Sequence, residues 1–193
     1  MDLTQGTVEQ KSNRAKKMML WFGIASLLMS FAGLTSAFIV SSSRPDWVSE
    51  IQLPKAFLFS TITILISSVT FHLAKKNSKK ENNNLTGVFL IITFILGIIF
   101  IILQFMGFAE IINMGYHFTG PTSNVTFSFI YLIATVHIAH VIAGLIVLGV
   151  IIFNYFRGKY KFGQTLGLEL GAIFWHFLDF LWLYLILFFY FFR

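Results

Sequence analysis

The fold is decided by long apolar segments such as Leu85 to Met106, which reads LTGVFLIITFILGIIFIILQFM and contains no charged residue. The hydrocarbon core of a bilayer is about 30 Å thick, and a helix needs roughly 20 apolar residues to cross it. This segment has the required length and composition. It therefore predicts a transmembrane helix.

Four more segments share this character, and together they predict an all-α fold, an integral membrane bundle of five transmembrane helices. The expected helices are 18–40, 55–73, 85–106, 125–153 and 166–192, within a single membrane domain that covers residues 1–193. The overall composition, 56% hydrophobic and 11% charged, does not fit a soluble domain of this length. The first segment is too long for a signal peptide, so we expect a retained helix.

Basic residues predict how the bundle is oriented. Eleven lysines and arginines fall in the N-terminal tail and the second and fourth loops, and three fall on the opposite side. Because basic loops are retained in the cytoplasm, we expect the N-terminus inside and the C-terminus outside. The basic residues form short clusters between apolar segments and are not arranged along one polar face. Membrane topology therefore explains the net charge of +6 better than binding to nucleic acid does.

Four of these basic residues are candidates for weak contacts with anionic lipid headgroups. They are Lys75, Lys76, Arg157 and Lys159.

Ionisable residues inside the membrane are costly and therefore informative. The expected fourth helix has His137 and His140 three residues apart, and the fifth has Glu169, His176 and Asp179 at spacings of seven and three. Residues so spaced lie on one side of a helix. We expect these side chains to face protein, together with Trp182 and with Gln104 of the third helix.

We expect the stripe of the fifth helix to face the histidines of the fourth. Three interpretations follow from the residues alone: a proton relay, a metal site, or a structural network that ties these two helices together. A metal site would need ligands that converge from two helices. A haem would need one axial histidine from each of two helices, so a membrane cytochrome b is an alternative. The structural network is favoured, because buried polar side chains commonly hydrogen-bond across membrane helices. The absence of cysteine excludes thiolate metal sites and disulfides.

Two motifs in the expected fourth and fifth helices resemble subunit III of the haem-copper terminal oxidases. One is Thr135-Val-His137-Ile-Ala-His140-Val-Ile-Ala-Gly144, and the other is Gly167-Leu-Glu169-Leu-Gly171 followed by Trp175-His176-Phe177-Leu178-Asp179-Phe180-Leu181-Trp182-Leu183. Weaker similarities extend over most of the chain. The chain resembles the short bacterial form of the family with five helices.

The resemblance implies a non-catalytic subunit of a proton-translocating complex in aerobic respiratory electron transport, which reduces oxygen to water. It implies no catalytic residue, metal or redox cofactor in this chain, haem and copper in partner subunits, and subunit I as the main contact. It also implies bound phospholipid, a location in the bacterial cytoplasmic (inner) membrane, and support of assembly, stability and proton or oxygen access. The structural polar network would consist of Gln104, His137, His140, Glu169, His176, Asp179 and Trp182.

The sequence departs from the family pattern at two positions where many members have an acidic residue. Leu27 stands in the first helix and Gly107 follows the third-helix glutamine. Roles that the family assigns to those carboxylates do not transfer to this chain. A subunit III-like partner of a nitric oxide reductase is a related alternative with the same five-helix pattern.

Overall fold

The structure, a computed structural model, describes residues 7–48, 53–78, 83–120, 123–158, 160 and 166–192. Its helices are α1 (Val8–Val40), the short 3-10 helix η1 (Ser41–Ser43), α2 (Lys55–Ser78), α3 (Asn83–Asn113), α4 (Val125–Phe156) and α5 (Leu166–Phe191). The five α-helices are long and apolar enough to cross a membrane. The protein is therefore an all-helical, multi-pass membrane protein, as the sequence predicted.

The helices extend beyond the predicted segments, most clearly at α1, which begins ten residues before the predicted Met18. Thr7 caps this helix: its hydroxyl accepts a hydrogen bond from the Gln10 backbone N–H, and its own N–H donates to the Gln10 side chain. Hydropathy identifies only the apolar part of a helix, so the predicted bounds leave out its polar end turns. Polar turns such as the one that carries Lys11 and Arg14 continue the helix into the headgroup region.

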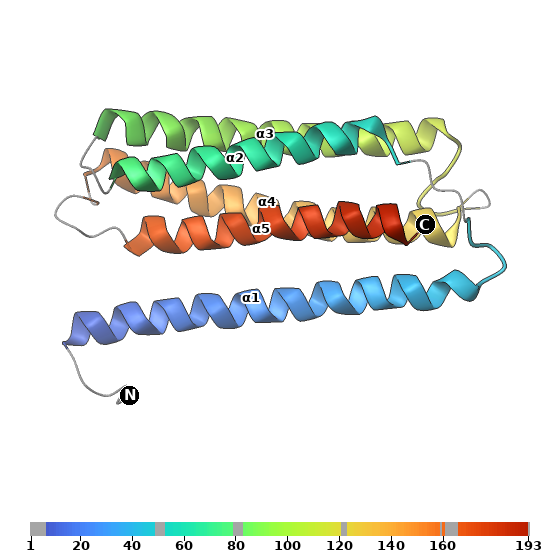
Figure 1. Cartoon of the computed structure of the whole chain (residues 1–193), viewed down its shortest axis with the longest axis horizontal. Coiled ribbons are helices and arrows are strands. Elements are labelled where there is room, and N and C mark those ends of the chain that lie inside the picture. Colours follow the sequence, from blue (N-terminus) through green and yellow to red (C-terminus); the bar gives the residue numbers. More distant parts are fainter. Residues whose placement is uncertain are drawn as a thin grey trace.

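Consecutive helices run antiparallel (Figure 1). α2 lies beside α3 and also packs on α5, α4 packs on both α3 and α5, and α1 stands along the outside of α4 and α5. The core of the bundle contains large, fully enclosed aromatic side chains. They include Phe57, Phe71, Phe100, Phe127, Trp175, Trp182 and Phe189.

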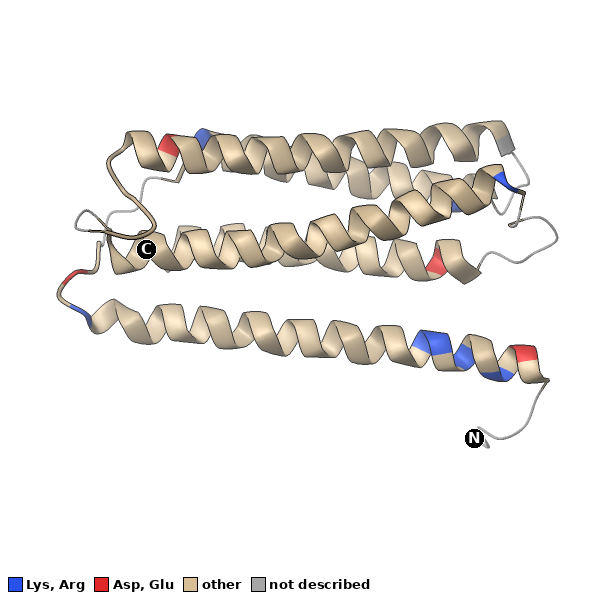
Figure 2. Ribbon diagram, turned by 180° about the vertical axis from the view of Figure 1, so that it is seen from behind, with Lys and Arg blue, Asp and Glu red and all other residues tan. Residues whose placement is uncertain are grey.

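The chain alternation gathers the described basic residues of three segments at one end, which we call the basic end (Figure 2). It comprises Lys11, Arg14, Lys16 and Lys17 in the first turns of α1, Lys75 and Lys76 in the last turn of α2, and Arg157 at the end of α4. Lys55 and Arg44 lie at the opposite end, as the predicted loop pattern requires.

α1 is attached to the bundle through its second half. Phe31, Thr35 and Phe38 are buried there, and the Thr35 hydroxyl lies 3.3 Å from the Tyr184 hydroxyl of α5. Nothing lies within 4 Å of a Cβ built at Gly23 in the first half. All four buried residues of α1, from Ile24 to Phe38, lie at or beyond its middle, so the helix packs on the bundle mainly through its second half.

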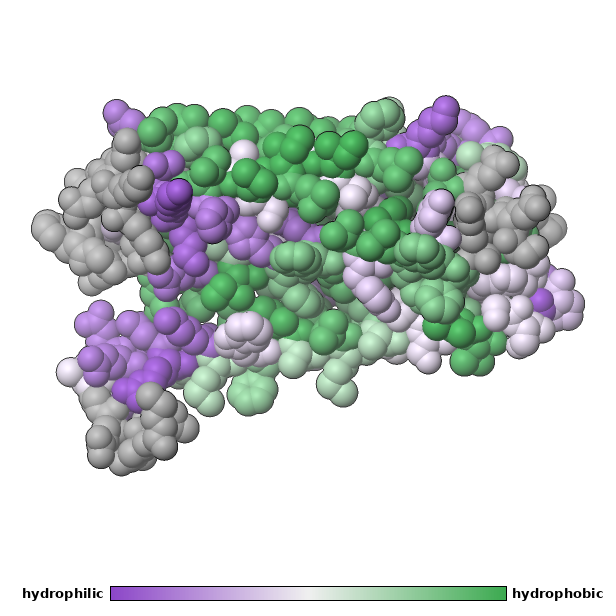
Figure 3. All heavy atoms as spheres, in the orientation of Figure 1, coloured by the Kyte–Doolittle hydropathy of each residue, from purple (hydrophilic) through white to green (hydrophobic). Residues whose placement is uncertain are grey.

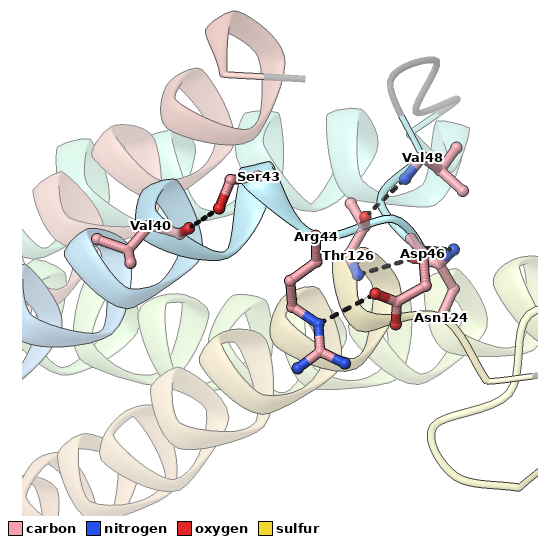
Figure 4. Close-up of polar contacts among 7 residues, drawn as sticks. All are labelled: Val40, Ser43, Arg44, Asp46, Val48, Asn124 and Thr126. Atoms are coloured by element: carbon pink, nitrogen blue, oxygen red, sulfur yellow. Dashed lines mark hydrogen bonds and ion pairs between the residues drawn. The ribbon is translucent and has the colours of Figure 1, made fainter.

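Polar contacts after α1 fasten it to the start of α4 (Figure 4). The Asn124 side chain donates a 2.6 Å hydrogen bond to the Asp46 carbonyl, and the Val48 N–H donates to the Thr126 hydroxyl at 3.1 Å. The Arg44 Nε donates to Asp46 at 3.0 Å, and this hydrogen bond holds the pKa of the Asp46 carboxyl below its ordinary value. The loop thus joins α1 and α4 at the end opposite the basic end.

Candidate functional site

The polar residues of the membrane interior converge on α2, a helix that the sequence did not single out. α2 carries Ser60, Thr61, Ser67 and Ser68, two adjacent pairs separated by seven residues. Residues seven apart lie two turns apart on the same side of a helix. Here that side faces α3 and α5, and we call its contacts the α2–α5 seam.

Two tryptophans of α5 donate hydrogen bonds across this seam. Trp175 Nε1 donates to Ser67 Oγ at 2.9 Å, and Trp182 Nε1 donates to Thr61 Oγ1 at 3.0 Å. The tryptophans are seven residues apart and their acceptors, Ser67 and Thr61, are six apart, so the two hydrogen bonds lie about two helical turns from each other. An indole N–H buried without a partner would cost free energy in lipid, and the hydroxyls remove that cost.

His176 and Asp179 lie between the two tryptophans. His176 Nδ1 is 2.7 Å from Ser68 Oγ and 3.8 Å from Asp179 Oδ2. The histidine side chain is 26% exposed, whereas that of Asp179 is 3% exposed. Neither Asp179 carboxyl oxygen has a hydrogen-bond partner among the described residues. Among the described residues, the ionisable group that lies within 4 Å of this carboxyl is the His176 ring.

Gln104 of α3 joins the same seam. Its Nε2 donates a 2.8 Å hydrogen bond to Ser60 Oγ, and its Oε1 has no partner in the part of the chain that the structure describes. Ser60 and Gln104 are fully buried. The seam thus connects three helices, with α2 in the middle.

The histidines of α4 are not hydrogen-bonded to α5. His137 is fully buried and stacks on Trp182, with ring centroids 5.2 Å apart, and neither ring nitrogen has a hydrogen-bond partner among the described residues. Phe31 and Phe100 meet its edges at 6.2 and 5.9 Å. His140 Nδ1 donates to the Val136 carbonyl of its own helix at 2.7 Å.

The sequence therefore identified residues of one region but paired the helices differently. We expected the fifth-helix stripe to face the histidines of the fourth helix, whereas the hydrogen bonds of His176, Trp175 and Trp182 go to α2. Glu169 is half-buried in the first turn of α5. The hydroxyls of α2 were missed, because their seven-residue spacing does not by itself distinguish contacts between helices from bonds to their own backbone.

The described residues contain no group of three or more histidines and carboxylates placed to hold a metal ion. A haem ligated by His137 would need the surrounding aromatic rings to move, because Trp182, Phe31 and Phe100 enclose the imidazole. What the seam offers instead is a set of hydrogen bonds that link α2 to α3 and α5.

The candidate headgroup contacts lie at the basic end. Lys75 and Lys76 are in the last turn of α2. Arg157 caps α4, with its guanidinium 5.3 Å from the centre of the Phe153 ring. Lys159 lies outside the described residues.

The two positions that depart from the family pattern have different surroundings. Leu27 is half-buried on α1 between Ile24 and Phe31, which face the bundle. A Cβ at Gly107 would collide with the buried ring of Phe57 on α2. A longer side chain at residue 107 is therefore excluded by the present packing.

Comparison with known proteins adds a family match. Residues 5–193 match the family model described as "Cytochrome c oxidase subunit III". The chain is 27% identical, over 93% of its length and 88% of the relative, to "Cytochrome bo(3) ubiquinol oxidase subunit 3" of Buchnera aphidicola subsp. Acyrthosiphon pisum. It is 37% identical, over 66% and 64%, to the protein of that name in Buchnera aphidicola subsp. Baizongia pistaciae. A "Probable quinol oxidase subunit 3" of Staphylococcus saprophyticus is 27% identical, over 93% and 90%.

Proposed function

Because the chain belongs to the cytochrome c oxidase subunit III family, we propose that it is the non-catalytic subunit III of a proton-translocating haem-copper terminal oxidase. In this proposal the complex reduces oxygen to water in aerobic respiration. The chain itself carries no redox cofactor, and partner subunits hold the haem and copper. Its main contact is subunit I.

The observation that supports a structural role is the α2–α5 seam. Its hydroxyls, indoles, imidazole and amide are engaged with each other between helices, as in a network that fixes helix positions. In this proposal the network supports assembly of the complex and slows its inactivation during turnover. Proton or oxygen access to subunit I is a further proposed role of the assembled subunit.

The names of the relatives favour quinol as the electron donor. The relatives quoted above are named as subunits of quinol oxidases. These names also favour an oxidase over a nitric oxide reductase. Membranes that contain the complex should oxidise a soluble quinol rapidly and reduced cytochrome c slowly, and the reverse rates would contradict this donor.

We propose that the basic end faces the cytoplasm of a bacterium, which places the complex in the cytoplasmic (inner) membrane. The clustering of basic residues supports this orientation. Lys75, Lys76, Arg157 and Lys159 would then meet anionic phospholipid of the inner leaflet. Alkaline phosphatase fused to the C-terminus should be active, whereas the same enzyme fused to the N-terminus should be inactive.

A deletion strain tests the proposed function. Without this chain, membranes should lose most of their steady-state oxidase activity or inactivate faster during turnover, and re-expression should restore it. Unchanged activity and unchanged inactivation rate would contradict a role in the oxidase.

A further inference from the structure

One surface of the bundle carries polar side chains at a depth where an isolated membrane protein should be apolar. We call it the α2–α5 face, and it consists of Leu65, Ser68, Val69 and His72 of α2 with His176 and Phe180 of α5. Val69 and Phe180 are 60% and 71% exposed. The ring centroids of His72 and His176 are 6.5 Å apart, which connects the two helices at this surface.

Two polar residues of this face, Ser68 and His176, lie well inside the ends of their helices. α5 begins and α2 ends at the basic end. His176 and Ser68 each lie ten residues from these helix ends, which corresponds to about 15 Å at 1.5 Å per residue. In Figure 3, hydrophilic surface extends from the left-hand end toward the middle of the molecule, with apolar surface on both sides.

The other outward surfaces differ in composition. α3 presents Ile95, Ile98 and Ile102, and α4 presents Ile142 and Ile146, all of them exposed. Such side chains are solvated well by lipid. A histidine within the membrane-spanning part of a helix is not, because ionisable groups within the bilayer normally face protein or a water-filled cavity.

His176 also has an unused hydrogen-bonding atom. Its Nδ1 faces two oxygens, Ser68 Oγ at 2.7 Å and Asp179 Oδ2 at 3.8 Å. A proton on Nδ1 suits both, because a carboxylate can only accept. Nε2 on the other side of the neutral ring is then an acceptor, and no described residue donates to it.

We propose that the α2–α5 face packs against a transmembrane helix of another oxidase subunit, which donates a hydrogen bond to His176 Nε2 from a hydroxyl, amide or indole group. This inference rests on the proposed function, which supplies the partner. The seam positions the imidazole, because Ser68 Oγ lies 2.7 Å and Asp179 Oδ2 3.8 Å from its Nδ1. Val69 and Phe180 expose apolar side chains on the same face. The isoleucine-lined faces of α3 and α4 remain in lipid.

Photo-crosslinking in native membranes tests the proposal without removing any seam hydrogen bond. Benzoyl-phenylalanine replaces one exposed phenylalanine at a time: Phe180 of α5, Phe22 of α1, Phe105 of α3 and Phe153 of α4, with exposed fractions of 71%, 71%, 58% and 60%. We expect an adduct with another oxidase subunit from Phe180, and from the same probe at Val69, but not from Phe105 or Phe153.

The possible outcomes distinguish a failure of this inference from a failure of the proposed function. Co-purification of haem-bearing subunits with adducts only from the α1, α3 or α4 probes would overturn this face and keep the oxidase role. Adducts with a second copy of this chain would overturn the proposed occupant. If no oxidase subunit co-purifies with the chain, the proposed function itself is contradicted.

A second measurement tests the hydrogen bond. His176→Phe keeps a ring of similar shape but removes both nitrogens, and His176→Gln keeps a hydrogen-bonding side chain. We expect the phenylalanine variant to lose the partner during detergent washing and the glutamine variant to retain more of it. Equal retention of both variants and the wild type would overturn the role of His176.

Discussion

The Trp175 indole N–H donates to the Ser67 hydroxyl at 2.9 Å, between two fully enclosed side chains on α5 and α2. Ser67 and Ser68 meet Trp175 and His176 as consecutive pairs, so this contact fixes the register of the two helices. The register in turn aligns Thr61 with Trp182. The register of α2 against α5 thus accounts for both tryptophan hydrogen bonds of the seam.

Ser67→Ala should destabilise the chain by leaving the Trp175 N–H without an acceptor. Hydrogen bonds between membrane helices are worth about 0.6 kcal/mol on average and about 1.7 at most, and we expect a loss within this range. SDS titration of the purified protein, followed by tryptophan fluorescence, measures it. Ser30→Ala is the control, because Ser30 is exposed and bonds only the Ser26 carbonyl of its own helix. Equal effects of the two substitutions would contradict the seam.

Gly107→Ala should lower stability, whereas Gly149→Ala should raise it. Both remove a helical glycine, which contributes up to about 1 kcal/mol in propensity. The new Cβ collides with the Phe57 ring at residue 107 but lies 3.9 Å from Phe94 at residue 149. Overpacking costs about 1–3 kcal/mol, which exceeds the propensity gain over most of that range.

The Phe57→Leu substitution provides the internal check on this explanation. Combined with Gly107→Ala, it should recover part of the lost stability in the same SDS titration. Additive losses in the double variant would show that the Phe57 ring is not the cause.

Phe38→Ala should loosen α1 far more than Phe22→Ala on the same helix. Phe38 is fully buried against Trp47 and Phe188, with ring centroids 4.8 and 5.3 Å away, whereas Phe22 is 71% exposed. We expect a loss of up to about 3 kcal/mol, the lower end of the range for soluble cores, because lipid also solvates apolar groups. Proteolysis within the loop that follows α1 reports the loosening, and similar cleavage of both variants would contradict this attachment.

Asp179→Leu should weaken retention of the chain in the complex without changing the haem content per catalytic subunit. The substitution removes the carboxyl that lies 3.8 Å from His176 Nδ1, so the imidazole loses one of the two groups that orient it. Gel filtration of the purified complex after mild heating measures the fraction of chain retained. Wild-type retention would show that Asp179 has no such role.

Much of the fold could be predicted because the bilayer restricts what a chain can do. All five transmembrane helices were found by length and hydropathy, and the structure confirms them. The additional turns at Val8 and after Met106 were missed, because outside the hydrocarbon core capping groups such as Thr7 decide where a helix ends. The attachment of α1 through Phe38 and the Asp46 loop depends on tertiary contacts that no periodicity encodes.

The family match confirms the resemblance carried by the motifs around His137 and His176. The helix pairing was harder to predict. Serine and threonine in a membrane helix commonly bond their own backbone, as Thr63 does here with the Phe59 carbonyl, so Ser67 and Ser68 gave no separate signal. Which neighbour His176 faces follows from the bundle arrangement and could not be derived from spacing along one helix.

A cofactor-free subunit of an oxidase should carry haem only through its partners, and one purification distinguishes this from a haem protein. The tagged chain is extracted gently from its own membranes, and a reduced-minus-oxidised visible spectrum is recorded before and after the partners are stripped. We predict that haem and copper accompany a large catalytic subunit and disappear with it. Haem that stays with the isolated chain would contradict the account and make His137, His140 and His176 the candidate ligands.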